Sequence, residues 1–242
     1  MGSGEEDKEV TSFILWSGGK ESYLSLLRAR DQGLEVKYAL SYIERRNRRL
    51  IGCYLREETI RRQVRTLGLE FVPVYGSRRK GDFEERLVEV LESLKDVEAG
   101  VFGDIRHTDH RRLLERVSRK VNIKPLFPLW GLEEDLILKE VLEVSRPLVV
   151  CRRVKVVPPK FLGGFLSEDL ISYLKRSGRS ITGEDGEYQT LVVEGKDISL
   201  SYSLGRRFRR SYYECVDVEV KDEGLCNGRD GLCGKVCGKE VT

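Results

Sequence analysis

Strand-like and helix-like hydrophobic patterns alternate through the first half of the chain. The strand-like segments are short and rich in β-branched and aromatic residues, whereas the helix-like segments are longer and repeat their apolar residues every three or four positions. Such alternation builds a parallel sheet with helices on both faces, and ligands bind at the carboxyl ends of its strands. We predict strands at residues 10–16, 36–43, 70–74 and 100–105, and helices at 21–31, 57–67, 83–95 and 110–122.

The alternating pattern loosens after Pro125. The segment KPLFPLWG, residues 124–131, contains two prolines and cannot form a central strand. Beyond it we predict helices at 133–145 and 167–176 and extended segments at 146–157 and 188–193. We therefore predict an α/β chain with a doubly wound parallel sheet in residues 1–128, a smaller α+β domain in 129–222, and a Cys- and Gly-rich tail in 223–242.

The hexapeptide SGGKES, from Ser17 to Ser22, follows the first predicted strand and opens the first predicted helix. The unpaired N–H groups and the dipole of a helix start both favour an anion such as phosphate. Two common phosphate motifs are excluded. A Walker A loop would need glycine where the chain has Ile14 and Ser or Thr where it has Glu21, and the dinucleotide fingerprint would need a third glycine.

The composition indicates the class of protein but does not identify a binding partner. The 242 residues are 34% charged and 40% hydrophobic, which is typical of a globular chain. Apolar runs of membrane-spanning length and a secretory leader are both lacking in this sequence, so we expect a cytoplasmic protein. The net charge of +3 gives no general case for nucleic acid. The basic run ERRNRR, residues 44–49, is most simply a solvated loop, although it leaves contact with a ribosomal factor or RNA open.

Four motifs together resemble a known family. The loop SGGKES resembles the SGGKDS loop of the PP-loop ATP pyrophosphatases, which have the adenine nucleotide alpha-hydrolase-like fold. VFGDIRHTDHRRLLERV, KPLFPLWG and TGEDGEYQTLV then follow in an order similar to the diphthine ammonia ligase branch. The resemblance covers residues 13–193. It implies an AMP-forming ligase that uses ATP, magnesium and ammonia to convert diphthine on translation elongation factor 2 to diphthamide through an acyl-adenylate, releasing pyrophosphate.

The resemblance also implies roles for individual residues. Lys20 would act in catalysis by offsetting charge on the departing pyrophosphate, and Asp104 would line the reacting cleft. Diphthine carries a quaternary ammonium, which favours acidic and aromatic surroundings. Glu184, Glu187 and Tyr188 are therefore expected to bind the protein substrate. The nucleotide-binding loop would consist of Ser17, Gly18, Gly19, Lys20, Glu21 and Ser22.

Glu21 departs from the family loop, which has Asp at this position. Its extra methylene could shift a magnesium contact or a loop-closing contact, and an acidic residue in a first helical turn also has a purely structural explanation in the helix dipole. Asp104, His107 and His110 suggest a metal by residue type. We expect no zinc there, because a spacing of three between two histidines often arises by chance.

Four cysteines lie near the carboxyl end, and this region falls outside the resemblance. Their spacing matches no standard zinc or iron–sulfur signature, so metal ligation, disulfides and free thiols remain open. Cys53 and Cys151 are expected to be ordinary core residues. The candidates for metal ligation are Cys215, Cys226, Cys233 and Cys237.

Two other functions are compatible with these motifs. A PP-loop RNA sulfur transferase would use the tail thiols and the basic loops. A non-catalytic ATP-binding interaction module would bind nucleotide without releasing AMP, as expected if Glu21 has abolished turnover. We predict the amide ligase in preference to both, because four motifs occur in the order that its family shows.

Overall fold

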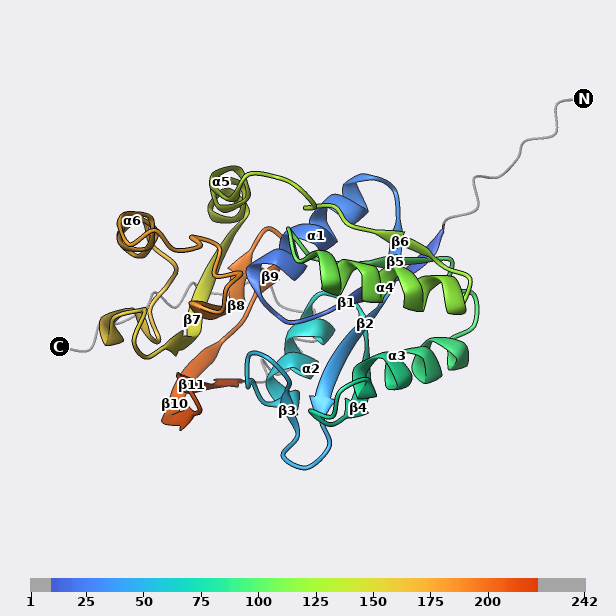
Figure 1. Ribbon diagram of the computed structural model, residues 1–242, viewed down its shortest axis with the longest axis horizontal. Helices are drawn as coiled ribbons and strands as arrows, with labels where there is room; N and C mark the ends of the chain where they lie inside the picture. The colour runs from blue at the N-terminus through green and yellow to red at the C-terminus, as the bar shows by residue number, and fades with distance from the viewer. Residues whose placement is uncertain (1–9, 222–242) are drawn as a thin grey trace, which may run out of the picture.

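The computed structural model describes residues 10–221, and within them the chain forms two β-sheets with helices packed around them (Figure 1). Among these residues the first sheet has six strands. Five of them are parallel and lie in the order β4, β2, β1, β5, β6. The sixth, the short β3, pairs antiparallel with β2. The strands are β1 (Thr11–Leu15), β2 (Glu35–Glu44), β3 (Arg49–Leu50), β4 (Glu70–Gly76), β5 (Ala99–Val101) and β6 (Lys124–Leu126).

Helices cover both faces of this sheet. Ile14 of β1 packs in one hydrophobic core with residues of α1 (Lys20–Asp31) and α2 (Glu57–Thr66). Its neighbour Phe13 points to the opposite face, into a core with α3 (Asp82–Ser93) and α4 (Thr108–Lys120). This alternation along one strand follows from the two-residue period of β-structure. The predicted doubly wound parallel sheet is therefore confirmed.

In the first half of the chain, most helices and strands begin and end within two residues of the positions predicted from the sequence. The largest difference is the strand predicted at 100–105, which ends at Val101. The chain turns away there because it must pass the start of α1: a Cβ on Gly103 would lie 3.2 Å from backbone atoms of Glu21 and Ser22. The proline-containing β6 is an edge strand, as expected for a segment with a missing N–H donor.

The second sheet is antiparallel, in the order β10, β11, β7, β8, β9. The long β10 and β11 were not among the predicted strands. Helix α5 (Glu134–Val144) leads into this sheet, and a short 3-10 helix (Pro159–Phe161) and α6 (Glu168–Arg176) follow its first strand. The strands are β7 (Ser145–Arg153), β8 (Tyr188–Gly195), β9 (Ile198–Ser199), β10 (Tyr202–Arg210) and β11 (Tyr213–Val220).

One hydrophobic core joins the two sheets. It contains Ile14 of the first sheet, Leu26 and Ile60 of helices α1 and α2, and Leu191 and Val218 of the second sheet. Helices α1 and α2 thus lie between the sheets, as Figure 1 shows. The predicted domain boundary at residue 128 falls in the segment that leaves β6 for α5, and the division into separate domains stays a prediction.

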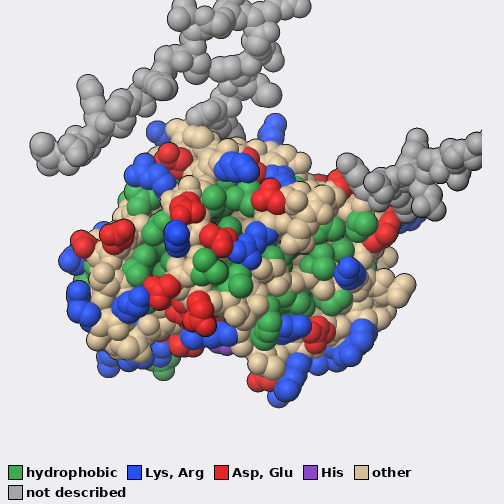
Figure 2. All heavy atoms as spheres, turned by 90° about the horizontal axis from the view of Figure 1, so that it is seen from above, with side chains coloured by type: hydrophobic (Ala, Val, Ile, Leu, Met, Phe, Trp, Pro, Cys, Tyr) green, Lys and Arg blue, Asp and Glu red, His purple; other side chains and the backbone are tan. Residues whose placement is uncertain are grey.

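Charged groups of both signs cover the visible surface. Figure 2 shows Lys and Arg side chains interspersed with Asp and Glu over the face seen from above, with hydrophobic groups between them. No helix in residues 10–221 combines the length and the apolar character that a membrane crossing requires.

The cysteines correct one prediction. Cys215 of β11 forms a disulfide with Cys151 of β7, its direct partner in the antiparallel register, so it is not a free thiolate that could ligate metal with the tail. The bonded residues are 64 positions apart, and spacing along the chain does not reveal a contact made by strand pairing. Cys53 is buried with a free thiol whose pKa burial raises to about 12. Cys226, Cys233 and Cys237 lie outside the described residues.

Candidate active site

The glycine loop between β1 and α1 is shaped by packing as well as by its position at a helix start. Gly18 adopts a left-handed φ of +78°, and a Cβ there would lie 2.7 Å from Cδ1 of Ile60 and 2.8 Å from Oε1 of Gln63. Gly19 is also close to its surroundings, with Oγ1 of Thr190 3.3 Å from an added Cβ. Both glycines therefore let the loop approach α2 and β8 closely.

A buried amide side chain fastens this loop to the second sheet. The Nε2 group of Gln63 donates to the carbonyl oxygens of Gly18 at 3.0 Å and Val192 at 2.7 Å, and its Oε1 accepts from the indole of Trp16 at 2.9 Å. The backbone N–H of Val192 donates to the same Gly18 oxygen at 2.9 Å. Our sequence analysis missed Gln63. The available signal was a polar residue among the apolar positions Ile60 and Val64 on one face of α2.

Lys20 is buried against the second sheet rather than exposed to solvent. Only 2% of the residue is exposed. Its Nζ donates to the carbonyl oxygen of Thr182 at 2.7 Å, lies 2.6 Å from Oε1 of Glu21, and sits 4.6 Å from the ring centroid of Tyr188. The backbone N–H of Lys20 donates to Oγ1 of Thr190. Backbone and side chain of this residue therefore both contact segments more than 160 positions further along the chain.

A cavity of about 510 Å³ opens beside the loop, at the carboxyl ends of β1, β2 and β5. One part of its wall is apolar and the other is rich in oxygen and imidazole groups. The apolar part includes Trp16, Leu50, Ile51 and Phe83. The polar part includes Ser17, Glu21, Ser22, Asp104, His110 and Glu184.

The cavity brings together three of the motifs recognised in the sequence. His107 joins two of them, because its Nε2 lies 2.8 Å from the carbonyl oxygen of Glu184 and 3.5 Å from the carboxylate of the same residue. Arg106 adds an ion pair to Asp185 at 2.9 Å. Segments 103–110 and 183–188 therefore meet at the mouth of the glycine loop, although about 80 residues separate them in the chain.

Three side chains that line the cavity have shifted pKa values, and burial together with a hydrogen bond to Asp82 raises the pKa of Tyr42 to about 12. Burial, followed by the nearby negative charge of Glu21, raises the pKa of Glu184 to about 7. Burial disfavours the charged imidazole of His110, but the hydrogen bond and the charge of Asp104 outweigh it and hold the pKa of His110 above its ordinary value. Glu184 therefore changes its charge near neutral pH, which is a property of many functional carboxylates.

Glu187 and Tyr188, the other predicted contacts to substrate, do not line the cavity. Both are buried, with 1% of each residue exposed. Glu187 accepts a hydrogen bond from the backbone N–H of Asp185 at 3.1 Å, and the hydroxyl of Tyr188 donates to the carbonyl oxygen of Ile181 at 2.7 Å. In this structure they shape the turn that carries Glu184, and their roles toward substrate stay predictions.

Nothing in the described part of the chain forms a group of three or more His, Cys, Asp or Glu side chains arranged to hold a metal ion. One carboxylate oxygen of Glu21, at the start of α1, is left without a hydrogen bond among the residues that the structure describes. This Oε1 atom is buried and accepts no aligned hydrogen bond within residues 10–221, although the Lys20 ammonium is close.

Comparison with known proteins gives one matching family model and several similar curated proteins. Residues 10–125 match the family model for the diphthamide synthase N-terminal domain. The chain is 31% identical to a diphthine–ammonia ligase of Rattus norvegicus and 29% identical to that of Homo sapiens, each over 142 residues that make up 55% of this chain and 53% of the relative. The chain thus spans about half the length of the curated relatives it matches.

A solved structure resembles the chain more distantly. It is described as a predicted subunit of tRNA methyltransferase from Methanocaldococcus jannaschii, with 20% sequence identity and a TM-score of 0.43 over 78% of this chain and 100% of that one.

The packing of Gly18 gives a prediction with a built-in control. Gly33 has the same φ of +78° but nothing within 4 Å of an added Cβ. We expect Gly33→Ala to lower the free energy of unfolding by about 1 kcal/mol, the cost of a left-handed alanine. Gly18→Ala should lower it by about 1–3 kcal/mol more, because the methyl group overpacks the contact with α2. Urea unfolding of both variants measures the difference, and equal losses would show that the loop does not need this close approach.

Proposed function

Because the chain belongs to the diphthine–ammonia ligase family, we propose that it joins ammonia to the carboxylate of diphthine on translation elongation factor 2, using ATP. The observation that carries this proposal is the 510 Å³ cavity, which is lined by hydroxyl and carboxylate groups of the glycine loop together with Asp104 and Glu184. Such a cavity can hold a nucleotide and a second substrate side by side, as condensation of the two requires.

We assign the phosphates of ATP to the loop side of the cavity. Ser17 and Ser22 offer hydroxyl groups there, and the start of α1 adds the positive end of a helix dipole. The apolar wall that includes Trp16 and Phe83 suits a purine ring. Glu21 and Asp104 are the oxygen ligands expected for magnesium, and the buried oxygen of Glu21 without an aligned donor supports that fit. The ion would neutralise phosphate charge when bound.

The proposed reaction has two steps. The diphthine carboxylate attacks the α-phosphorus of ATP and the bond to the β-phosphate oxygen breaks, so pyrophosphate leaves and an acyl-adenylate forms. Ammonia then attacks the acyl carbon, loses a proton, and AMP departs with the carbon–oxygen bond pair. Lys20 does not line the cavity itself, but it lies between Ser17 and Glu21 of the loop that does. We propose that it exchanges the carbonyl oxygen of Thr182 for phosphate oxygens when ATP binds.

Glu184 is placed to recognise the protein substrate. It lines the cavity close to Glu21 of the glycine loop and belongs to the turn held by His107 and Arg106. Its ionised carboxylate would attract the quaternary ammonium of diphthine by charge, and the partial burial of the group strengthens this attraction. Because the pKa of Glu184 is near 7, we propose that its protonation tunes substrate binding.

The role of Lys20 predicts a specific kinetic defect. Lys20→Ala removes a charge that matters most as pyrophosphate leaves, so we expect AMP formation to slow by about a hundredfold or more. The assay uses labelled ATP, magnesium, ammonia and diphthine-bearing elongation factor 2, and it separates AMP from ADP. Lys95→Ala, at an exposed lysine, is the matched control and should retain full activity.

A thermal midpoint for each variant separates a catalytic defect from unfolding, because Lys20 is buried. The proposed mechanism fails if ADP is the product. It also fails if folded Lys20→Ala protein releases AMP as fast as the Lys95→Ala control.

The pKa of Glu184 predicts pH-dependent binding. A carboxyl with a pKa of about 7 is about one-tenth ionised at pH 6 and about nine-tenths ionised at pH 8. If the ionised form binds the quaternary ammonium, the Kd for diphthine-bearing elongation factor 2 should fall about tenfold over this range. Glu184→Gln should bind weakly and with no change between the two pH values. Titration calorimetry without ATP measures this directly, and a wild-type Kd independent of pH would exclude the proposed contact.

A further inference from the structure

A basic surface lies outside the candidate active site, where the β2–β3 turn meets the start of α2 and the β10–β11 turn. Two adjacent hollows of about 430 and 600 Å³ form it, and Asn47 borders both. Four arginines line the first hollow and three line the second, whereas neither is lined by lysine. Arg49 is the most buried of the seven, with 16% of its side chain exposed. We call the other six, Arg46, Arg48, Arg56, Arg61, Arg78 and Arg210, the arginine surface.

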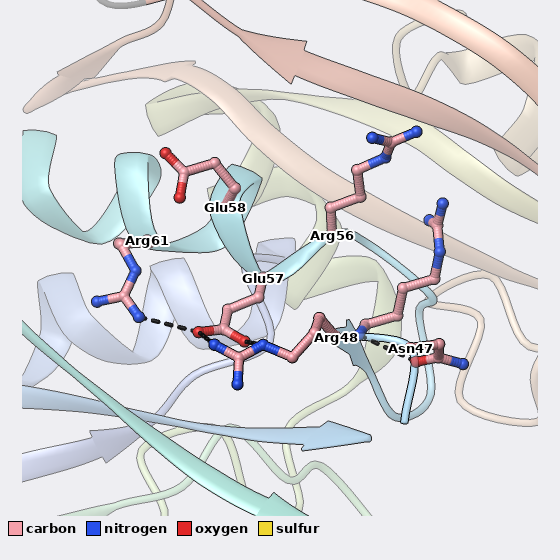
Figure 3. Close-up of a pocket in the computed structure, with 7 residues that line it drawn as sticks. Asn47, Arg48, Arg56, Glu57, Glu58 and Arg61 are labelled. Carbon is pink, nitrogen blue, oxygen red and sulfur yellow. Dashed lines mark hydrogen bonds and ion pairs between the residues drawn. The ribbon is translucent and has the colours of Figure 1, made fainter. Parts of the chain in front are cut away.

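The carboxylates within the arginine surface balance only part of its charge. Figure 3 shows Arg48 and Arg61 converging on Glu57 from opposite sides, each 2.9 Å from one of its oxygens. A second carboxylate, Asp217, is likewise shared by Arg49 and Arg56. Because two arginines share each of these carboxylates, positive charge remains. The shared pairs also hold the guanidinium groups in place, which lowers the entropy lost when a ligand binds.

Two of the arginines are exposed and have no acidic partner within the part of the chain that the structure describes. Arg46 lies in the β2–β3 turn and Arg210 ends β10, and neither forms an ion pair with a carboxylate among residues 10–221. Arg78, which lines the same hollow, is 3.6 Å from Glu44 and is only loosely paired. These groups are therefore available to an anionic partner.

Aromatic rings accompany the cations. Tyr212, in the turn next to Arg210, is 73% exposed, which is unusual for a side chain of its size. Tyr54 lines the second hollow, where the guanidinium of Arg78 lies 5.1 Å from its ring centroid. The exposed ring of Tyr212 beside a groove of positive charge suits nucleotide bases, which stack on aromatic faces while their phosphates contact the cations.

We propose that the arginine surface binds single-stranded RNA. Guanidinium groups match phosphate oxygens in pairs and also stack on bases, so a surface of arginine without lysine suits a nucleic acid. An acidic protein segment would use the same charges, but it would gain little from the exposed ring of Tyr212. This RNA binding lies beyond the proposed amidation and does not rest on it.

Fluorescence anisotropy with a labelled oligouridine of about 12 nucleotides tests the proposal. We expect saturable binding that weakens as salt rises, since bound phosphates release counterions. Replacing Arg46 and Arg210 together by Ala should weaken binding about tenfold or more and reduce the slope of log K against log salt by about 1.4, since each lost phosphate contact accounts for about 0.7 on a single strand. The matched control replaces exposed Arg119 and Arg176 by Ala and should leave both values unchanged.

Tyr212→Ala separates base stacking from charge. We expect it to weaken RNA binding about tenfold without changing the salt slope. The proposal is overturned if the oligouridine does not bind saturably, or if the Arg119 and Arg176 control loses as much affinity as the Arg46 and Arg210 variant. It is also overturned if a polyglutamate of equal charge binds as tightly and Tyr212→Ala has no effect, since the surface would then fit an acidic protein segment.

Discussion

The buried amide of Gln63 is the contact on which the rest of the site depends. It donates to Gly18 and Val192 and accepts from Trp16, so one side chain ties the end of β1, the glycine loop and β8 together. A buried amide with all of these partners contributes modestly to stability, but loss of any partner exposes a desolvation cost of about 1–3 kcal/mol. The arrangement is therefore specific: the loop cannot shift without leaving polar groups unpaired.

This fastening explains why the site is built from both sheets. With the loop held on β8, the first turn of α1 lies beside the turn that carries Glu184, and Lys20 reaches Thr182 and Tyr188. The cavity then collects groups from segments that are far apart in sequence. The same geometry limits the access of phosphate to Lys20, because its ammonium is already hydrogen-bonded to Thr182 and only 2% of the residue is exposed. The proposed phosphate binding at this loop would thus be coupled to the position of the turn that carries Thr182 and Glu184.

The sequence predicted what local pattern and chain order can encode. Apolar periodicity located the helices that flank the first sheet, and the order of four motifs indicated the family. The contacts that the sequence could not predict join residues that are far apart along the chain. Nothing in the spacing of Cys151 and Cys215 indicates that β7 and β11 pair, and Lys20 looked like an open phosphate ligand because Thr182 is 162 positions away. The polar, arginine-rich β10 lacks the alternation that marks a half-buried strand.

The central claim is that ATP binds in the cavity where the glycine loop meets the second sheet. Photolabelling with an azido-substituted ATP, followed by peptide mapping, tests it most directly. We expect labelled peptides from the cavity walls, in residues 15–22, 42–51, 103–110 or 184–189 or in the peptide that contains Phe83, with labelling suppressed by excess ATP. Labelling that excess ATP suppresses equally well but that maps only to peptides outside these segments would contradict it.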